Sequence, residues 1–559
     1  MGTMLQDRFW PAEGLGGELR LERHFDGRRF RCFADRPSTV DALFRRSLTR
    51  RAEAEALVAG ERRISYAELD RLVDAMAGNL AASGIRAGDR VALLLGNCPE
   101  FLVAILACAR LGAVSMPLGT RSRQPELEYA LNDSGAAALI FESEFAAALP
   151  EPASVPSLRL RIVVGDAVSG AEPVAAFLAP AAPPPSASIG EEDTATILYT
   201  SGTTGKPKGA MLSHLNIVHS TLHFTRCMGL TSADRSLLAV PAAHVTGTVA
   251  ILLTAICCGG ASVVLRNFKA RDFIELASRE RITFTCMVPA MYILCLMDAE
   301  FERFDLGSWR VGSFGGAPMP EATIAELARK LPRLQLSNAY GATETTSPTT
   351  MMPLGETAGH EASVGQVVPC GQVRVVDENG RDVPPGASGE IWIRGPMVVP
   401  GYWNKPEANA ASFTDGFWHS GDVGSLDEQG FLRIFDRLKD MINRGGYKIF
   451  SAEVENALAY HPGIAECAVV GRPDPVLGER VCAFVLPKGA GISAAELRSF
   501  CAERMADYKV PEIVELVREP LPRNANGKVQ KAILRQRAMR LGAGPGNSIG
   551  LRHRPLPSG

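Results

Sequence analysis

The sequence has no excess of basic residues, no paired metal-binding cysteines and no uninterrupted long apolar run. Lysine plus arginine number 59 against 61 aspartate plus glutamate, so no positive field attracts nucleic acid or an anionic membrane surface. The 12 cysteines are scattered, without a C-x-x-C pair, which argues against a zinc module or disulfide framework and favours reduced thiols. The apolar run at residues 250–265 contains two glycines and is shorter than the ~20 residues of a membrane span. We expect a core helix there that leads into a strand.

The composition is that of a folded protein with several domains. Apolar residues make up 46% and charged residues 21% of the 559 residues, a balance far from that of disordered chains. A chain of this length exceeds one hydrophobic core, at roughly 100 to 200 residues per domain. Residues 1–10 carry charges and no apolar segment, which argues against a secretory signal. We therefore expect a soluble cytoplasmic protein.

Helix and strand patterns alternate in the first third of the chain, which predicts a parallel sheet. An Ala/Pro-rich stretch at residues 171–190 is typical of a connection without a core of its own. A second α/β unit then follows to about residue 369, a small antiparallel β-unit begins near residue 371, and the last ~100 residues form a small mixed domain. The expected strands are residues 90–95, 137–141, 161–164, 195–199, 263–265, 283–288, 334–336, 373–376, 390–393, 467–470 and 481–486, and the expected helices residues 69–80, 99–112, 451–458 and 493–504.

The strongest local signal is T-S-G-T-T-G-K-P-K-G at residues 200–209, directly after a predicted strand. Glycine lets the backbone approach phosphate oxygens, hydroxyls and amides donate to them, and lysine supplies charge. The G-x-x-x-x-G-K-[ST] spacing fails, because Pro207 stands five positions after Gly202. A flexible loop without a ligand is the alternative, which the paired lysines disfavour.

This loop resembles that of the adenylate-forming superfamily, which contains acyl-CoA synthetases, luciferases and nonribosomal peptide adenylation domains. Seven further segments follow in the family's order: P-A-A-H-V-T-G at 241–247, S-F-G-G-A-P at 313–318, N-A-Y-G-A-T-E at 338–344, S-G-D-V-G at 420–424, D-R-L-K-D at 436–440, R-G-G-Y-K at 444–448 and P-R-N-A-N-G-K at 522–528. A single Y-G-x-T-E would be weak evidence, whereas the ordered set is specific. The chain is most similar to an acyl-CoA synthetase.

The resemblance implies an α/β fold with a large N-terminal domain of two stacked α/β subdomains plus a small β-subdomain, followed by a small mobile α+β C-terminal lid. The expected limits are 1–438 for the N-terminal domain, with subdomains at about 1–180, 190–370 and 371–436, then 439–541 for the lid and 542–559 for a flexible tail.

The resemblance also implies a site for ATP and Mg²⁺. The implied ATP-binding residues are Thr200, Ser201, Gly202, Thr203, Thr204, Gly205, Lys206 and Lys208 around the phosphates, Gly315, Gly316, Ala317, Pro318, Asn338, Tyr340 and Gly341 around the adenine, and Asp422 and Arg437 at the ribose. Thr343 would reach the α-phosphate and Glu344 would hold Mg²⁺, a hard cation that prefers carboxylate and phosphate oxygens. For Asp422, a turn residue after Gly421 is the alternative.

The resemblance implies three catalytic residues, Lys528, Thr343 and Glu344. Lys528 matches the family's catalytic lysine. Attack of a carboxylate on the α-phosphorus brings two anions together, so positioned cations contribute most of the catalysis. No general base is needed, because an acid with a pKa near ~4.3 is already ionised at neutral pH. A solvated turn residue is the alternative for Lys528.

Transfer to a thiol is a second, chemically different step. The resemblance implies that the lid rotates about a hinge at Lys439 and brings in a face that contains Gly445, Gly446 and Lys448. The alternative for the two glycines is a hairpin turn.

The segment at residues 241–247 and Gly341 match the family's acyl pocket, which His244, Val245 and Gly247 would line. Nonribosomal adenylation domains usually carry an aspartate that pairs with the amino group of the substrate, and this chain has no obvious counterpart. Acetyl-selective relatives close the pocket with a tryptophan, which is absent from the motifs around Tyr340. Alanines at residues 242 and 243 leave room. These features favour an acid larger than acetate, either a medium- or long-chain fatty acid or a cyclic or aromatic acid. His244 as a packed core histidine is the alternative.

The leading interpretation is an ATP-dependent acid:CoA ligase that forms acyl-AMP and pyrophosphate and then acyl-CoA and AMP. A ligase that loads a carrier protein and a catalytically silent nucleotide-binding homologue are the alternatives. The family also implies a homodimer. His219 and His223 stand four apart, a spacing that zinc sites use, but they lack a third ligand in the sequence.

Overall fold

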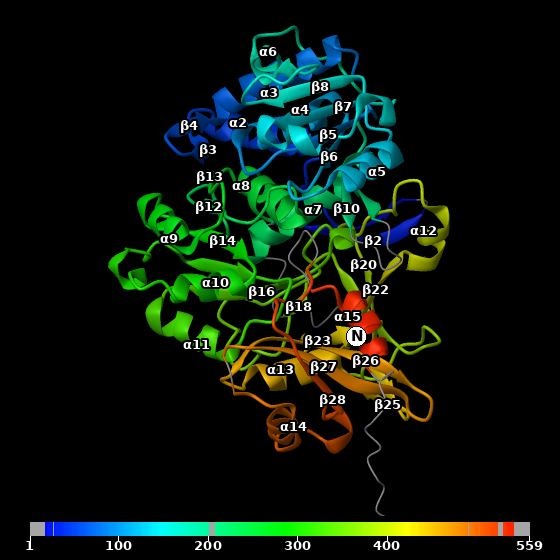
Figure 1. The fold of residues 1–559 in the computed structure, drawn as a ribbon. Coiled ribbons are helices and arrows are strands. Elements are labelled where there is room, and N and C mark those ends of the chain that lie inside the picture. Colours follow the sequence, from blue (N-terminus) through cyan, green and yellow to red (C-terminus); the bar gives the residue numbers. More distant parts are fainter. Residues whose placement is uncertain are drawn as a thin grey trace, which may run out of the picture. The chain divides into compact units, whose positions relative to one another are not determined.

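The computed structural model describes residues 10, 17–25, 27–200, 207–489, 491–523 and 529–541, and Figure 1 shows its ribbon. The chain divides into two compact units. Unit 1 contains Met1–Ser420 and Gly424–Ile434, and unit 2 contains Gly421–Val423 and Phe435–Gly559. The predicted α/β class, with a large N-terminal and a small C-terminal part, is confirmed.

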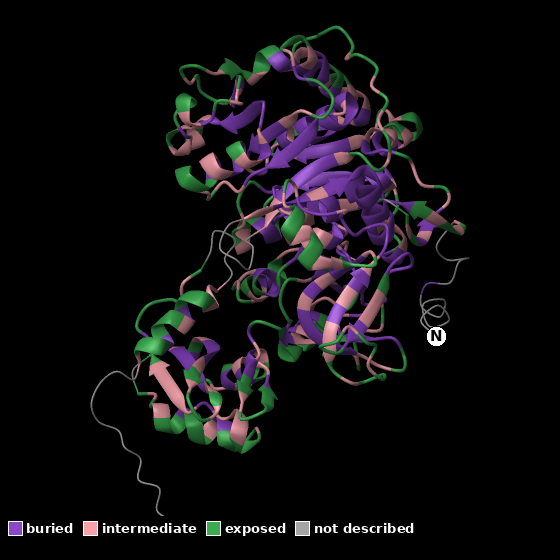
Figure 2. Cartoon of the chain, turned by 90° about the vertical axis from the view of Figure 1, so that its right-hand side faces the viewer, coloured by how far each residue is buried: buried purple, intermediate pink, exposed green. Residues whose placement is uncertain are grey.

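The first sheet of unit 1 has seven strands and a parallel centre. In order across the sheet they are β11 (Lys208–Ser213), β10 (Thr194–Thr200), β6 (Val114–Pro117), β5 (Arg90–Leu94), β7 (Ala138–Glu142), β8 (Leu160–Val164) and β9 (Glu172–Pro173). Its helices are α3 (Tyr66–Ala82), α4 (Pro99–Leu111), α5 (Gln124–Ser134) and α6 (Val174–Leu178). The expected parallel sheet is confirmed, and Figure 2 shows its strands in the buried interior.

Helix α4 illustrates how local sequence places an element in the core. It begins at Pro99, whose fixed φ suits a first helical turn, and ends at Gly112, which adopts a left-handed φ of 76°. Every residue from Phe101 to Leu111 is buried. A helix that is apolar on all sides must be enclosed by other elements, and α4 packs against α2 (Val40–Arg51) and α3.

The second sheet has nine strands and is parallel from β3 to β16. Its order is β18 (Gln366–Val367), β17 (Thr350–Met351), β16 (Gln335–Tyr340), β15 (Val311–Phe314), β14 (Phe284–Met287), β12 (Arg235–Leu238), β13 (Ala261–Val264), β3 (Glu55–Ala59) and β4 (Arg62–Ser65). Helices α7 (His214–Cys227), α9 (Ala270–Arg279), α10 (Pro289–Leu296) and α11 (Glu321–Lys330) belong to this half (Figure 1).

The sheets differ from the expected subdomain limits. β3 and β4 precede every strand of the first sheet but belong to the second, beside β13, whereas β10 and β11 follow residue 190 and belong to the first sheet, beside β6. The first sheet is therefore formed by consecutive strands, β5 to β11, whereas the second sheet combines β3 and β4 with strands from β12 onward. One hydrophobic core includes buried residues of both sheets and of α4 and α7, because strands that cross over bury their side chains with both halves.

The Ala/Pro-rich stretch at residues 171–190 differs in part from the prediction. Its first half forms β9 and α6, and Phe177 of α6 is 2% exposed. Asn79 of α3 donates from Nδ2 to the carbonyl oxygens of Phe177 and Ala179 at 3.1 and 3.0 Å. The buried aromatic ring of Phe177 anchors the stretch to α3. The Ala/Pro-rich composition of the stretch as a whole does not reveal the effect of this single residue.

The apolar run at residues 250–265 is a helix that leads into a strand, as expected. It contains a π-helical segment η3 (Thr246–Leu253), helix α8 (Thr254–Cys258) and strand β13. π-helical turns are rare and occur frequently beside functional sites. Among the described residues, no helix is both long and apolar enough to cross a membrane.

Two small β-units belong mainly to unit 1, although residues 421–423 of β22 and 435–437 of β23 are assigned to unit 2. An antiparallel sheet contains β19 (Gln372–Val376), β20 (Gly389–Arg394), β22 (Phe417–Leu426), β21 (Phe413–Thr414) and β23 (Leu432–Arg437), with α12 (Pro406–Ser412) beside it. The predicted antiparallel β-unit is thereby confirmed. Near the N-terminus, β1 (Leu19–His24) and β2 (Arg28–Phe33) form a separate hairpin.

Unit 2 is a sheet with helices on both faces. Its strands are β25 (Tyr447–Ile449), β24 (Ile442–Arg444), β27 (Gly478–Pro487), β26 (Ile464–Asp474) and β28 (Ile513–Leu516), and its helices α13 (Ser451–Ala459), α14 (Ala494–Ala502) and α15 (Lys531–Arg540). Along β27, Val481 packs in a core with α13 and α14, whereas Cys482 packs in a core with α15. The alternation follows from the two-residue period of a strand.

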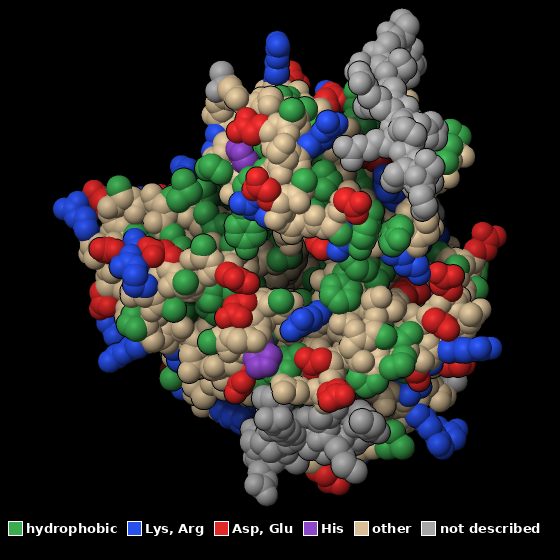
Figure 3. Space-filling view, turned by 90° about the horizontal axis from the view of Figure 1, so that it is seen from below, with side chains coloured by type: hydrophobic (Ala, Val, Ile, Leu, Met, Phe, Trp, Pro, Cys, Tyr) green, Lys and Arg blue, Asp and Glu red, His purple; other side chains and the backbone are tan. Residues whose placement is uncertain are grey.

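Acidic and basic side chains are intermingled on the face drawn in Figure 3. This agrees with the near-equal numbers of the two kinds of charge in the chain.

Candidate functional site

The glycine- and hydroxyl-rich segment lies between β10 and β11. Residues 201–206 lie outside the described residues, and with them Ser201, Gly202, Thr203, Thr204, Gly205 and Lys206. The two ends of the segment are described: Thr200 pairs with Lys208 across the antiparallel strands, and the Thr200 hydroxyl lies 3.4 Å from the Lys208 carbonyl oxygen. The chain therefore leaves and re-enters the sheet at one point.

A carboxylate from a distant part of the chain lies at this point. Glu344 is in the short helix η5 (Thr343–Thr345), which follows β16. Its Oε1 lies 3.4 Å from the Thr200 hydroxyl, and the Tyr402 hydroxyl donates to the same oxygen at 2.9 Å. The Lys208 ammonium is 5.0 Å from the centre of the Tyr402 ring, within the range of a cation–π contact. A hydroxyl, a carboxylate and a cation thus converge at the ends of the loop.

The oxygens of this cluster fit a hard divalent cation. Glu344 Oε1 interacts with the hydroxyls of Thr200 and Tyr402, whereas Oε2 accepts no hydrogen bond from the described part of the chain. A carboxylate oxygen of this kind suits Mg²⁺, which binds proteins through one or two carboxylates and takes its remaining ligands from phosphates and water. Burial, and then the charge of Glu344, raise the pKa of Tyr402, so its hydroxyl stays protonated and acts as the donor.

Sequence reasoning missed Tyr402. It stands in G-Y-W-N at residues 401–404, which lacks a cluster of polar or glycine residues. An isolated tyrosine between glycine and tryptophan is typical of packing.

The expected adenine-binding residues lie where two neighbouring parallel strands end. Gly315 follows β15 and Asn338 is in β16, and the register aligns Phe314 with Asn338. A Cβ atom on Gly315 would lie 2.3 Å from the Ala339 carbonyl oxygen, so only glycine permits this approach. The carboxyl ends of parallel strands are where open α/β sheets bind ligands.

The remaining residues of this group lie beside these ends. Gly316, Ala317, Pro318 and Gly341 are exposed, Tyr340 and Thr343 are half-buried, and Asn338 is buried and donates from Nδ2 to Ser363. The structure therefore brings the two motifs together, and their contact with adenine stays a prediction.

The segment expected to line the acyl pocket is held by a buried asparagine. Asn97, after β5, accepts from the Ala242 amide at 2.8 Å and donates to the carbonyl oxygens of Val240 and Leu265 at 3.0 and 2.9 Å. A Cβ atom on Gly247 would lie 2.3 Å from the Pro241 carbonyl oxygen, so the segment folds back tightly on itself. The π-helical segment η3 begins within its last two residues, at Thr246.

His244 and Val245 of that segment are half-buried. His244 therefore differs from the fully buried His219 and His223 of α7, and it is not an enclosed core histidine. Its role beside the acyl group stays a prediction.

The expected ribose pair lies in unit 2. Arg437 Nε is 2.6 Å from Asp422 Oδ1, and Asp422 is 5% exposed. Lys439, the expected hinge, is exposed, and Arg535 of α15 donates to its carbonyl oxygen at 2.6 Å. Ribose binding by Asp422 and Arg437 and the hinge role of Lys439 stay predictions.

Gly445 and Gly446 form the two-residue turn of the hairpin β24–β25. Both have positive φ, 58° and 88°, and the flanking Arg444 and Tyr447 pair across the strands, as in the turn with two left-handed positions that glycine favours. The hairpin reading of these glycines is therefore correct as a description of local structure. Lys448 beside them is exposed. A role in the thioester step is compatible with the turn and stays a prediction, whereas Lys528 lies outside the described residues.

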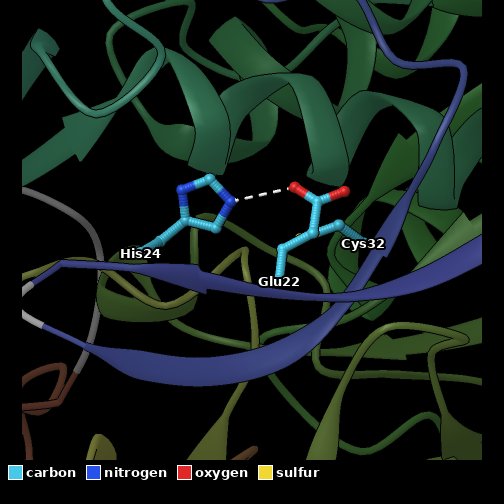
Figure 4. Close-up of side chains that lie close together, drawn as sticks. All are labelled: Glu22, His24 and Cys32. Atoms are coloured by element: carbon cyan, nitrogen blue, oxygen red, sulfur yellow. Dashed lines mark hydrogen bonds and ion pairs between the residues drawn. The ribbon is translucent and has the colours of Figure 1, made fainter.

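Glu22, His24 and Cys32 of the β1–β2 hairpin come close together (Figure 4) and offer metal-ligand atoms within 4.8 Å of one another. The carboxylate and the imidazole already have partners, however. The Arg36 guanidinium lies 2.6 Å from Glu22 Oε2 and lowers the pKa of that carboxyl to about 2, and His24 is 3.1 Å from Glu22 and 2.9 Å from Glu192. Burial raises the pKa of the Cys32 thiol to about 12. An ion-pair network that stabilises the hairpin explains the cluster.

His219 and His223 lie one turn apart on α7, and their imidazole rings form hydrogen bonds with backbone groups. His219 Nε2 accepts from the Phe33 amide at 3.3 Å and its Nδ1 lies 2.9 Å from the Leu215 carbonyl oxygen. His223 Nε2 accepts from the Cys370 amide at 3.4 Å. Both are packing residues.

Comparison with known proteins agrees with this site. The AMP-binding enzyme family matches residues 44–403, and the AMP-binding enzyme C-terminal domain matches residues 453–528. A feruloyl-CoA synthase from Amycolatopsis sp is 38% identical over 87% of this chain and 96% of its own length. An indoleacetate–CoA ligase from Aromatoleum aromaticum is 37% identical over 85% and 93%, and a long-chain-fatty-acid–CoA ligase from Mycobacterium tuberculosis is 33% identical over 85% and 93%.

Solved structures show the same fold. The o-succinylbenzoate CoA synthetase from Bacillus subtilis, in complex with its acyl-adenylate intermediate, matches with a TM-score of 0.79 and 32% identity over 88% of this chain and 97% of that one. The same enzyme has been solved with ATP and magnesium ion. An anthranilate CoA ligase in complex with anthranoyl-AMP matches with a TM-score of 0.83 and 27% identity over 90% and 98%.

The large α/β part, the small C-terminal part and the loop–carboxylate cluster define an adenylate-forming enzyme. The chain belongs to the AMP-binding enzyme family, and it is an AMP-forming acyl-CoA synthetase, an acid–thiol ligase.

Proposed function

We propose that this acyl-CoA synthetase activates an acid that carries an aromatic ring, with Mg·ATP and coenzyme A as co-substrates. The proposed use of Mg·ATP rests on the approach of the Thr200 hydroxyl to Glu344 at the ends of the loop. Two relatives named for acids with aromatic rings are 38% and 37% identical, whereas the long-chain ligase is 33% identical. The small side chains of the alanines at residues 242 and 243 would leave room for a ring in the acyl pocket.

The adenylation step follows from the charges at the site. An ionised carboxylate oxygen of the acid attacks the α-phosphorus, the bond to the bridging oxygen breaks, and pyrophosphate leaves with the electron pair. Lys208 and the loop would bind the β- and γ-phosphates, and Thr343 the α-phosphate. Glu344 would hold Mg²⁺, which neutralises the phosphate charge. Lys528 would stabilise the charge that builds up on the bridging oxygens.

Thioester formation uses the second set of residues. The thiol of coenzyme A attacks the acyl carbonyl, and AMP leaves as the carbon–oxygen bond breaks. Lys439 would act as the hinge, and Gly445, Gly446 and Lys448 would lie on the face that serves this step. We propose residues 1–438 and 439–541 as the two moving bodies. A cytoplasmic location and a homodimer complete the proposal.

The test is a panel of acids. Purified protein with Mg·ATP is given hydroxycinnamic, arylacetic, benzoic, medium-chain and long-chain fatty acids, with and without coenzyme A, and pyrophosphate, AMP and acyl-CoA are measured. We expect the highest kcat/KM for one of the aromatic classes, and acyl-CoA only when coenzyme A is present. If kcat/KM is more than about tenfold higher for a fatty acid, which equals ~1.4 kcal/mol of transition-state binding, the substrate is a fatty acid and the proposed aromatic acid is wrong. Transfer only to a carrier protein would exclude coenzyme A.

A further inference from the structure

Tyr402 contacts both charged groups of the candidate site. Its side chain is buried, with the residue only 5% exposed, and its hydroxyl donates to Glu344 Oε1 at 2.9 Å. Its ring faces the Lys208 ammonium at 5.0 Å. One side chain therefore links a cation at the end of the loop with the carboxylate of η5.

The backbone of Tyr402 is held on two sides. On one side, the chain around it runs beside β11: Met211 donates to Gly401 at 3.1 Å, and Trp403 donates to Gly209 at 2.8 Å. On the other, the Asn409 side chain accepts from the Tyr402 amide at 2.7 Å and donates to its carbonyl oxygen at 3.1 Å. The tyrosine is thus connected rigidly to the strand that leaves the phosphate loop.

The contact itself makes the Tyr402 hydroxyl the donor, because an ionised carboxylate oxygen can only accept a hydrogen bond. A neutral hydroxyl that donates to one carboxylate oxygen fixes the carboxylate's orientation and leaves the other oxygen for a cation. Partners of this kind beyond the ligand itself typically change metal affinity by about 10- to 100-fold when they are removed.

We propose that Tyr402 is a positioning residue that orients Glu344 toward Mg²⁺ and couples this orientation to the phosphate loop through Lys208. The inference rests on the proposed role of Glu344 as the magnesium ligand. Tyr402 itself touches neither substrate nor metal in this proposal.

The experiment measures the magnesium dependence of adenylation. Pyrophosphate release is followed against free Mg²⁺ at saturating ATP and acid for the wild type, Tyr402→Phe and Glu344→Gln. Tyr402→Phe keeps the ring over Lys208 and removes only the hydroxyl. We expect its half-saturating Mg²⁺ concentration to rise about tenfold, with the rate restored at high Mg²⁺. Thioester formation from supplied acyl-AMP should keep its wild-type rate.

Tyr199→Phe is the matched control. The Tyr199 hydroxyl donates to a carboxylate oxygen of Asp133 at 2.8 Å, so this variant also loses a tyrosine–carboxylate hydrogen bond within unit 1, to a carboxylate with no assigned metal. We expect it to retain the wild-type magnesium half-saturation, whatever its melting temperature.

The outcomes separate the two levels of the argument. A wild-type magnesium half-saturation in Tyr402→Phe, or equal shifts in both tyrosine variants, overturns the inference about Tyr402. If Glu344→Gln leaves the magnesium dependence unchanged, the assigned magnesium ligand is wrong instead. A wild-type protein that makes no AMP from any acid contradicts the proposed function.

Discussion

The Ala242 amide donates to Asn97 Oδ1 at 2.8 Å, although the two residues lie 145 positions apart in the chain. Asn97 is 6% exposed and also donates to the carbonyl oxygens of Val240 and Leu265. A side chain that follows strand β5 therefore determines the backbone position of the segment that contains His244.

Asn97→Ala should lower both stability and affinity for the acid. The change leaves buried backbone groups without partners, each at a cost of about 1–3 kcal/mol. We expect the free energy of unfolding to fall by about 2–4 kcal/mol, and the KM for the acid to rise more than the KM for ATP. Urea unfolding and steady-state kinetics measure both effects.

Asn132→Ala is the control for this prediction, because the Asn132 side chain donates to Ser154 at an exposed position. It should leave both KM values unchanged. Equal increases of the two KM values in Asn97→Ala would show that Asn97 does not act through the acyl segment.

Gly315→Ala should weaken ATP binding selectively. The added Cβ would lie 2.3 Å from the Ala339 carbonyl oxygen, so the ends of β15 and β16 must separate. We expect the KM for ATP to rise about tenfold or more, which corresponds to ~1.4 kcal/mol, with a smaller change for the acid. Gly190→Ala is a suitable control, because its nearest neighbour would be 3.6 Å away. An unchanged KM for ATP would show that the ends of β15 and β16 are not part of the adenine site.

Lys528→Ala should separate the two half-reactions. If Lys528 stabilises charge at the bridging oxygens, its loss slows adenylation by roughly 100-fold or more and leaves thioester formation from supplied acyl-AMP almost intact. Burst measurements of pyrophosphate release and assays with synthetic acyl-AMP report the two steps separately. An equal loss in both steps contradicts the assigned role.

Acid should destabilise unit 1 through its buried histidines. Burial lowers the pKa of His214 to about 4 and that of His223 to about 3, and it holds the pKa of His219 well below the ordinary value of 6.5. The unfolded chain therefore binds more protons than the folded one below pH 6.5, so stability falls as the pH drops toward 4.

The slope can be measured by urea unfolding at pH 5.0, 5.5 and 6.0. With three such groups, we expect the free energy of unfolding to change by at most about 4 kcal/mol per pH unit near pH 5 from this cause. The slope should be smaller in His223→Gln. Above pH 7.5 all three residues are neutral in both states, and the two proteins should show the same slope. An equal slope at pH 5 would contradict the prediction.

Local features were predictable because they depend on nearby residues. Pro99 and Gly112 bound α4 where the sequence places them, and the two glycines at 445 and 446 make a hairpin turn. The sequence also predicted a loop at residues 200–209, whose two described ends, Thr200 and Lys208, pair in the structure. Backbone preference and short-range hydrogen bonding suffice for each.

Tyr402 and Asn97 could not be recognised in the same way. Neither belongs to an ordered motif, and their partners lie 58 and 145 residues away. The sequence equally did not reveal that β3 and β4 join the second sheet and β10 and β11 the first, because the choice of a partner strand depends on which faces the whole core buries.

The sequence by itself determined the class of enzyme, the chemical groups of the site and the order in which they occur, since these are properties of residue types and their local spacing. Only the tertiary structure decided that a tyrosine outside every motif holds Glu344, and that an asparagine after β5 holds the acyl segment. Such contacts form when distant segments are packed into one core, where a buried polar group must find a partner wherever the chain supplies it.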